Sequence, residues 1–224
     1  MSSKKCPRCG LVNFADQAAC KRCGAALSET ATYEAKEKVP ERTGFSWLIK
    51  RALVVLGTVF ALLLIFYGSL LKSSERLSYD QQQVVAASIK VLEQGGFSRE
   101  AFVLRNFVAW RSTDNWWNRM VGHREAYAAA NFPFEIVTLY PEFFNNAVDD
   151  TERAAILLHE SYHLFGSGER AALESTWRNK HRLGWTEDKY AQTKVWRNTR
   201  ELTLNQVPQL FRCGRENNAD CTGF

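Results

Sequence analysis

The feature that most constrains this chain is an uninterrupted apolar run. Residues 52–71 read ALVVLGTVFALLLIFYGSLL, a stretch without a charged side chain. A helix rises 1.5 Å per residue, so this run would cover roughly 30 Å, the hydrocarbon thickness of a bilayer. A core helix seldom stays apolar on every face for so long, and a signal peptide has a shorter apolar region nearer the N-terminus. The run therefore predicts one transmembrane helix over residues 47–71.

Lysine and arginine are distributed unevenly around this run. Five precede it and only two follow it closely: Lys36, Lys38, Arg42, Lys50 and Arg51 before it, and Lys72 and Arg76 after it. Because cytoplasmic flanks carry the excess of Lys and Arg, the N-terminus is expected in the cytoplasm and residues 72–224 outside it.

The part of the chain beyond the apolar run is close to neutral. Residues 75–224 hold 18 basic and 19 acidic side chains, although the whole chain has a net charge of +5. Nucleic-acid-binding domains usually show a basic excess on the domain itself. No nucleic-acid partner is therefore expected.

The N-terminal segment carries two C-x-x-C pairs, each followed by a glycine. They are Cys6 with Cys9 and Cys20 with Cys23. Each pair can form a tight turn that presents two sulfurs to one ion, and two such turns complete a closed tetrahedral site of four thiolates. The reducing cytosol disfavours the alternative of two disulfides. Residues 1–26 are predicted to form a four-cysteine zinc ribbon with one structural Zn²⁺, followed by a solvated linker over residues 27–46.

This segment resembles short zinc ribbons. It is also similar to zinc fingers of the Ran-binding-protein type, because three residues separate Asn13 from Cys9 and six separate it from Cys20. It departs from that family at Lys4, where the family usually has a tryptophan. The resemblance implies a binding module, and some members bind RNA or ubiquitin. Since a closed site has no open position for catalysis, the ribbon is expected to dock an unidentified cytosolic partner.

A second motif, H-E-x-x-H, occupies residues 159–163. His159 and His163 are spaced to project from the same face of a helix, so both imidazoles can reach one ion. Glu160 would then lie near the water on that ion, where it can act as general base. A helix is expected here because residues 149–151 offer N-cap oxygens and apolar residues follow them. The motif predicts a catalytic Zn²⁺ site.

Catalytic zinc normally keeps three protein ligands and one open position. Reading on, the pattern becomes H-E-x-x-H-x-x-G-x-x-E and ends at Glu169. Gly166 can take the left-handed conformation that ends a helix, which would return the chain toward the ion. Glu169 is therefore the expected third ligand. Glu174 is the alternative, in a gluzincin-like arrangement in which the following helix supplies the carboxylate.

The extended pattern looks like the metzincin signature, with Glu169 in place of the third histidine. The methionine turn of that family has no counterpart, because Met1 and Met120 both precede the motif. The resemblance implies a zincin-like metallopeptidase domain over residues 75–224 that hydrolyses peptide or protein substrates. Two alternatives stay open: a zinc hydrolase of a non-peptide amide, and a non-catalytic membrane sensor or scaffold whose ribbon recruits a partner.

The surrounding patterns favour an α+β domain dominated by helices. Residues 134–140 are rich in β-branched and aromatic residues between two prolines and predict a strand, and a sheet edge there can pair with an extended peptide. A further strand is possible over residues 102–110. Helices are expected over residues 80–94, 171–183 and 187–200. Three candidates for an oxyanion-stabilising group, each more readily explained as structural, are His123, His181 and Tyr190.

Two cysteines stand apart from the ribbon. On the expected topology Cys213 and Cys221 face an oxidising space, where a disulfide can persist. The segment between them contains Gly214 and two asparagines, which suits a tight surface loop. A disulfide is predicted, with two reduced thiols in a frayed tail as the alternative.

Overall fold

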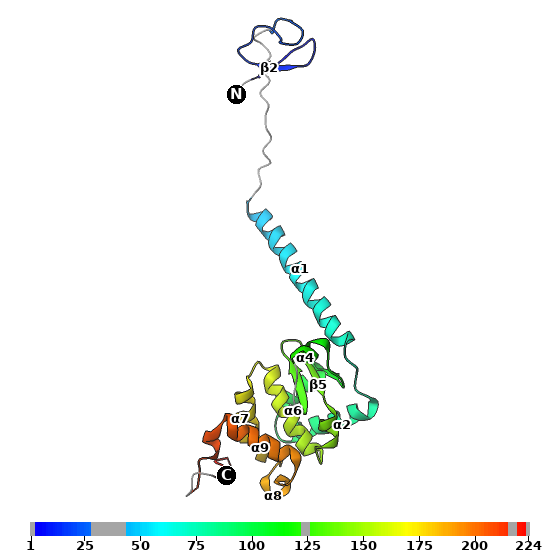
Figure 1. The fold of residues 1–224 in the computed structure, drawn as a ribbon, viewed down its shortest axis with the longest axis vertical. Coiled ribbons are helices and arrows are strands. Elements are labelled where there is room, and N and C mark those ends of the chain that lie inside the picture. The colour runs from blue at the N-terminus through cyan, green and yellow to red at the C-terminus, as the bar shows by residue number, and fades with distance from the viewer. Residues whose placement is uncertain (1–2, 28–43, 122–125, 215–218, 223–224) are drawn as a thin grey trace. The chain divides into compact units, whose positions relative to one another are not determined.

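The computed structural model describes residues 3–27, 44–121, 126–214 and 219–222. The chain forms two compact units, residues 1–57 and residues 58–224, and the division falls inside the long helix α1 (Gly44–Lys72) (Figure 1). The predicted linker lies outside the described residues except at its two ends. Each unit is considered separately below.

The first unit begins with a small antiparallel sheet of β1 (Ser3–Lys5) and β2 (Val12–Phe14). The chain turns sharply after each C-x-x-C pair, at Gly10 and Gly24, whose φ angles are 72° and 68°. Residues with a Cβ rarely adopt that conformation. Among the described residues of this unit, the buried apolar side chains are Cys6, Cys20 and Leu27. Such a small core cannot stabilise a fold alone, so the segment is expected to need its metal.

Helix α1 is long and apolar enough to cross a membrane. Its segment Ser46–Lys72 reaches a mean hydropathy of 2.4, and only 6% of that apolar window is buried. Side chains 52–65 are exposed, and Phe66 and Tyr67 are the first in the apolar run that other residues partly cover. A core helix of this composition would be mostly buried, which α1 is not.

The second unit contains a three-stranded sheet in the order β3-β5-β4. The strand predicted over residues 134–140 is β5 (Ile136–Leu139), and it is the central strand rather than an edge. It pairs in parallel with β3 (Ala109–Arg111) and antiparallel with β4 (Ala128–Asn131). The edge beside the H-E-x-x-H helix is therefore β4, which the sequence analysis missed because alanine has a low strand propensity.

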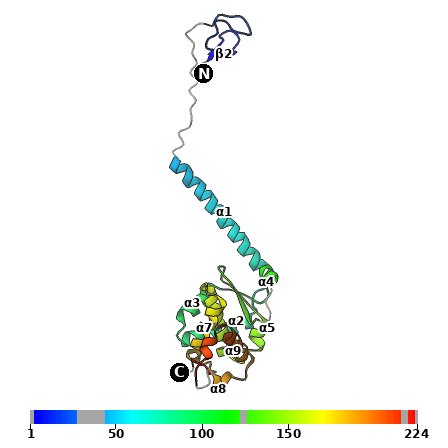
Figure 2. The same cartoon turned by 60° about the vertical axis from the view of Figure 1, so that its left-hand side comes forward.

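Helices make up most of this unit (Figure 2). The helix that carries the H-E-x-x-H motif, α6, packs against α2, α7 and β4. The elements are α2 (Tyr79–Gln94), α3 (Ser98–Asn106), α4 (Trp116–Val121), α5 (Pro141–Asn145), α6 (Asp150–Leu164), α7 (Glu169–Asn179), α8 (Glu187–Tyr190) and α9 (Lys194–Gln206), with 3-10 turns η1 (Lys180–Leu183) and η2 (Pro208–Phe211). The unit is helix-rich with a small sheet, as the α+β prediction requires.

The strand predicted over residues 102–110 is wrong for most of its length. Helix α3 continues to Asn106, and only β3 is extended. Ala101 and Leu104, three residues apart, are fully buried, whereas Phe102 is 57% exposed. Burial at that spacing is helical, and the β-branched and aromatic content of the segment concealed it.

The helix predicted over residues 187–200 is interrupted. Helix α8 ends at Tyr190 and α9 begins at Lys194, because the Thr193 hydroxyl accepts a hydrogen bond from the Trp196 amide and caps α9. The same hydroxyl donates to Glu152, which is wholly buried in the first turn of α6. Glu152 also accepts a hydrogen bond from the indole of Trp185 (3.5 Å). This buried acid therefore ties α6 to the segment that leads into α9.

A second buried charge, that of Lys180, lies at the C-terminal end of α7. The Lys180 side chain is 2% exposed, and its Nζ lies 2.9 Å from the Asp220 carboxylate. The Trp177 indole donates to that carboxylate at 3.0 Å. Burial raises the pKa of Asp220, but hydrogen bonds from Lys180 and Thr222 outweigh it and lower that pKa overall. Next to Asp220, Cys221 forms a disulfide with Cys213, with 5.1 Å between the Cα atoms.

Candidate metal centres

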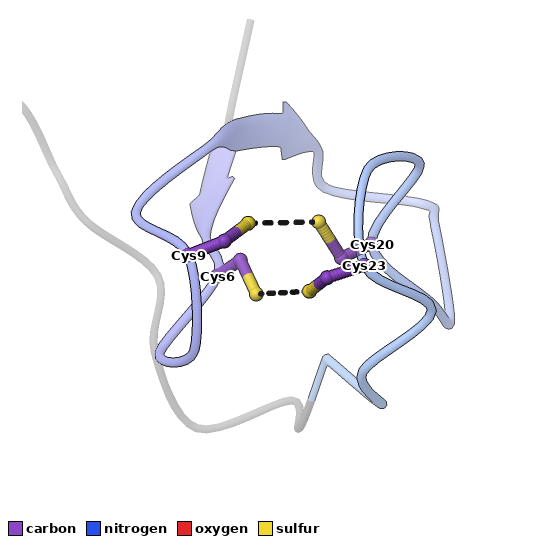
Figure 3. Close-up of side chains that lie close together, drawn as sticks. All are labelled: Cys6, Cys9, Cys20 and Cys23. Carbon is purple, nitrogen blue, oxygen red and sulfur yellow. Dashed lines mark hydrogen bonds between the residues drawn. The ribbon is translucent and has the colours of Figure 1, made fainter.

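The four N-terminal cysteines converge on one point. Their sulfurs all lie within 4.8 Å of one another, and the Cys6–Cys23 and Cys9–Cys20 sulfur pairs are each 3.6 Å apart (Figure 3). Zinc–sulfur bonds of about 2.3 Å in a tetrahedron would separate the sulfurs by about 3.8 Å. The cluster therefore fits a single tetrahedral metal ion.

Hydrogen bonds from the surrounding backbone favour thiolates here. Amide groups of Arg22 and Cys23 lower the pKa of Cys20 to about 6, and the amide of Cys9 lowers the pKa of Cys6. The Ala25 amide acts in the same direction on Cys23, but burial and the three other cysteines raise the pKa of Cys23 to about 12. The Asn13 amide contacts the Cys20 sulfur at 3.6 Å and accepts a hydrogen bond from the Lys21 backbone. Since a thiolate is the form that binds metal, the segment is prepared for an ion. Asn13, noted for its spacing, thus braces the second C-x-x-C turn.

Helix α6 presents the second group. Its N-cap is Asp149, whose carboxylate accepts hydrogen bonds from the Thr151 and Glu152 amides. At its other end Gly166 has a φ of 80°, the left-handed turn expected there, and its amide donates to the His163 carbonyl (2.9 Å). Helix α7 starts three residues later at Glu169, which brings that carboxylate back over the last turn of α6.

Three potential metal ligands meet at this turn. The Nε2 atoms of His159 and His163 are 3.1 Å apart, and Glu169 oxygens lie 3.6 Å from the first and 3.2 Å from the second. Nitrogen and oxygen ligands about 2.0–2.1 Å from a tetrahedral zinc are about 3.3 Å from one another. The distances therefore match a site of two histidines and one glutamate with a fourth position open.

The tautomer of His163 suits this role. Its Nδ1 lies 2.9 Å from the carbonyl oxygen of Ser167, which can only accept a hydrogen bond, so Nδ1 carries a proton and Nε2 is the nitrogen directed at the other ligands. The hydrogen bond with Glu169 raises the pKa of His163 to about 9, and both histidines hold the pKa of Glu169 well below its ordinary range. The site thus attracts positive charge, which a divalent cation would supply.

Glu160 lies beside these ligands but is not one of them. It is 5% exposed, and burial raises the pKa of its carboxyl, while the neighbouring histidines and a hydrogen bond from the Ala130 backbone act in the opposite direction. The edge strand β4 thereby holds Glu160 in place. A buried carboxyl with a raised pKa holds a proton more readily than an exposed one, which suits a group that takes a proton and returns it.

A cavity of about 650 Å³ opens over this group. Its walls come from β4, from α6 and α7, and from one face of α9. Sequence reasoning missed two polar residues of this wall, Tyr127 and Asn198, whose side chains are hydrogen-bonded at 2.9 Å. They are 71 positions apart in the sequence, and no motif marks either one.

The other candidates lie elsewhere. Glu174 forms an ion pair with Arg178 on α7 at 2.8 Å and does not line the cavity. Tyr190 donates to Asp149 at 2.7 Å, and it and the exposed His181 are likewise absent from the cavity lining. His123 is outside the described residues.

Comparison with known proteins adds nothing to this geometry: no protein-family model, curated protein or solved structure matches the chain.

Proposed function

We propose that this chain is a membrane-anchored zinc metallopeptidase. The observation that carries the proposal is the convergence of His159, His163 and Glu169 at a cavity of about 650 Å³, with the buried Glu160 beside them. A site kept only for structure would be closed by a fourth ligand and would need no buried acid next to it. The surplus carboxylate and the open side favour hydrolysis over a purely structural metal.

Each residue has a role in this proposal. A zinc ion held by His159, His163 and Glu169 would lower the pKa of a water molecule and polarise the scissile carbonyl. Glu160 accepts the proton that the attacking water loses and delivers it to the departing amine nitrogen, so that one water is consumed for each bond cleaved. The Ser167 carbonyl keeps His163 in the tautomer that binds metal.

The substrate in this proposal is an extended peptide. Strand β4 is the outer strand of its sheet, and residues 128–130 line the cavity. A peptide lying along that edge would add a strand by main-chain hydrogen bonds and would cross the site beside Glu160. Apolar lining residues such as Ile156, Leu173 and Leu202 would receive its side chains. The strand that would pair with the peptide is therefore β4, and not the strand expected over residues 134–140.

Metal retention tests the third ligand. We expect Glu169→Ala to lose zinc from the second unit, because the substitution removes a direct bond to the metal. Substitutions outside the ligand shell lower the affinity for the metal roughly 10–100-fold, and the loss for Glu169→Ala should be larger. Glu174→Ala is the matched control, since it removes the same group from the same helix, and it should retain zinc. Metal content after dialysis against a graded chelator measures both. Equal retention would refute Glu169 as a ligand, and a larger loss at Glu174 would favour the gluzincin-like arrangement.

Topology is the second element of the proposal. The excess of Lys and Arg before the apolar run of α1 favours an orientation with the ribbon in the cytoplasm and the peptidase unit outside it, in a space where the Cys213–Cys221 disulfide can persist. In spheroplasts or intact cells treated with protease, an epitope fused at Phe224 should be digested and one fused at Met1 should be protected. The opposite pattern would reverse the orientation.

A further inference from the structure

The last turns of α1 are in contact with the second unit. The ring of Phe66 lies 5.5 Å from that of Trp116 and 6.0 Å from that of Trp117, both in α4, and 5.2 Å from that of Phe134 in the turn between β4 and β5. The Trp116 indole donates to the Ser69 hydroxyl at 3.0 Å. These contacts lie within the compact unit of residues 58–224. The C-terminal part of α1, which belongs to this unit, and α4 are therefore fixed to each other.

Polar contacts hold one face of α4 against the sheet. The side chain of Asn118, 1% exposed, contacts the Thr138 hydroxyl at 3.3 Å and accepts a hydrogen bond from Asn131 at 2.6 Å. Trp117, Met120 and Val121, at helical spacings of three and four residues, lie away from this face. They are 46%, 75% and 63% exposed.

The β4–β5 turn adds a fourth exposed apolar side chain. Phe132 is 60% exposed and precedes Phe134, which contacts Phe66 and Tyr67 of α1. The ring of Phe132 also lies against Gly166 and lines the cavity. The apolar patch is defined by Trp117, Met120, Val121 and Phe132.

We propose that this apolar patch docks on a lipid surface, namely the leaflet from which α1 emerges. The inference rests on the proposed function in one respect, that α1 crosses the membrane. Phe66 lies six residues before Lys72, hence about 9 Å along the helix from it. A side chain packed on Phe66 is thus at the depth of roughly 5–10 Å that interfacial helices reach.

Continuity with α1 favours lipid over a protein partner. Trp117 is in contact with a residue of the apolar run itself, and tryptophan is enriched at the level of lipid headgroups. A protein bound to the patch would have to displace lipid from the same place. With lipid as the occupant, Phe132 brings one wall of the cavity to the membrane surface, and substrate segments close to the bilayer would be cut preferentially.

Photo-crosslinking of the full chain in phosphatidylcholine vesicles tests this. The photoreactive residue p-benzoylphenylalanine replaces Met120 in the patch, Val54 in α1, or Val148, which is 62% exposed just before the first turn of α6. The length of α6 places Val148 about 22 Å from the Gly166 end of that helix. Mass spectrometry then identifies lipid adducts. We expect lipid adducts at positions 54 and 120, with at least about tenfold less at 148, because only the first two would be in lipid.

The three positions separate the possible failures. An adduct at 54 with none at 120 would overturn the docking proposal and leave the membrane anchor intact. No lipid adduct at 54 would overturn the anchor and the docking together. The docking would also be overturned if positions 120 and 148 gave equal amounts of lipid adduct. The same holds if, in native membranes, position 120 crosslinked to a protein and not to lipid.

Discussion

Replacing Glu160 with glutamine is expected to abolish peptide hydrolysis while the second unit keeps its zinc. Glutamine has nearly the same shape and can still accept the hydrogen bond from the Ala130 backbone, but it cannot take a proton from water. General acid–base groups contribute roughly 10²–10⁴-fold, so turnover on a peptide library should fall by at least about a hundredfold. Turnover and zinc content should be measured on the same preparation.

The matched control is Glu174→Gln, which makes the same chemical change at the Arg178 ion pair, outside the cavity lining. It should retain wild-type turnover and zinc. If Glu160→Gln hydrolysed peptides at the wild-type rate, Glu160 would not be the base. Loss of zinc in Glu160→Gln would instead show that the carboxylate supports the metal site.

Replacing Cys20 with serine should unfold the N-terminal ribbon and leave the second unit folded. Structural zinc contributes roughly 10–16 kcal/mol of apparent binding free energy in comparable small modules, which is more than their small cores supply. One equivalent of zinc should be lost per chain, and trypsin should then cut at Lys21 and Arg22. Limited proteolysis with zinc analysis measures both effects.

The double variant Cys213→Ser with Cys221→Ser is the control, because it removes two sulfurs without touching the ribbon. Its ribbon should keep the metal and resist trypsin. A Cys20→Ser protein that kept both the full zinc content and the trypsin resistance would contradict a four-thiolate site.

Local patterns predicted the parts of the structure that depend on near neighbours. The Asp149 cap, the helix that follows it and the left-handed turn at Gly166 are each specified within a few residues, and all three are present. The spacing of the cysteine pairs likewise anticipated the convergence of their sulfurs. The uninterrupted apolar run over residues 52–71 predicted most of α1, although the helix begins eight residues earlier, at Gly44.

Features that depend on distant partners were not predictable from local patterns. Strand β4 is built largely from alanine and exists because β5 and α6 pack beside it. Nothing near Glu152 in the sequence marks it as a buried acid, because its partner Thr193 is 41 residues away. Tyr127 joins the cavity wall through a residue of α9. In residues 102–110 the composition is typical of a strand, but most of the segment is helical. The helix is favoured there because it buries Ala101 and Leu104.

The ion pair behind α7 has a consequence for biogenesis. Trp177 and Asp220 are 43 residues apart, so α7 emerges from the ribosome well before the carboxylate that neutralises Lys180. Until that carboxylate is present, Lys180 has no counter-charge, and burying its ammonium group alone would cost several kcal/mol. The second unit therefore cannot bury Lys180 with its counter-charge until the segment that contains Asp220 has been synthesised. Under the function and topology proposed above, the exported unit would reach its folded and active form only after its C-terminal segment had been threaded through the membrane.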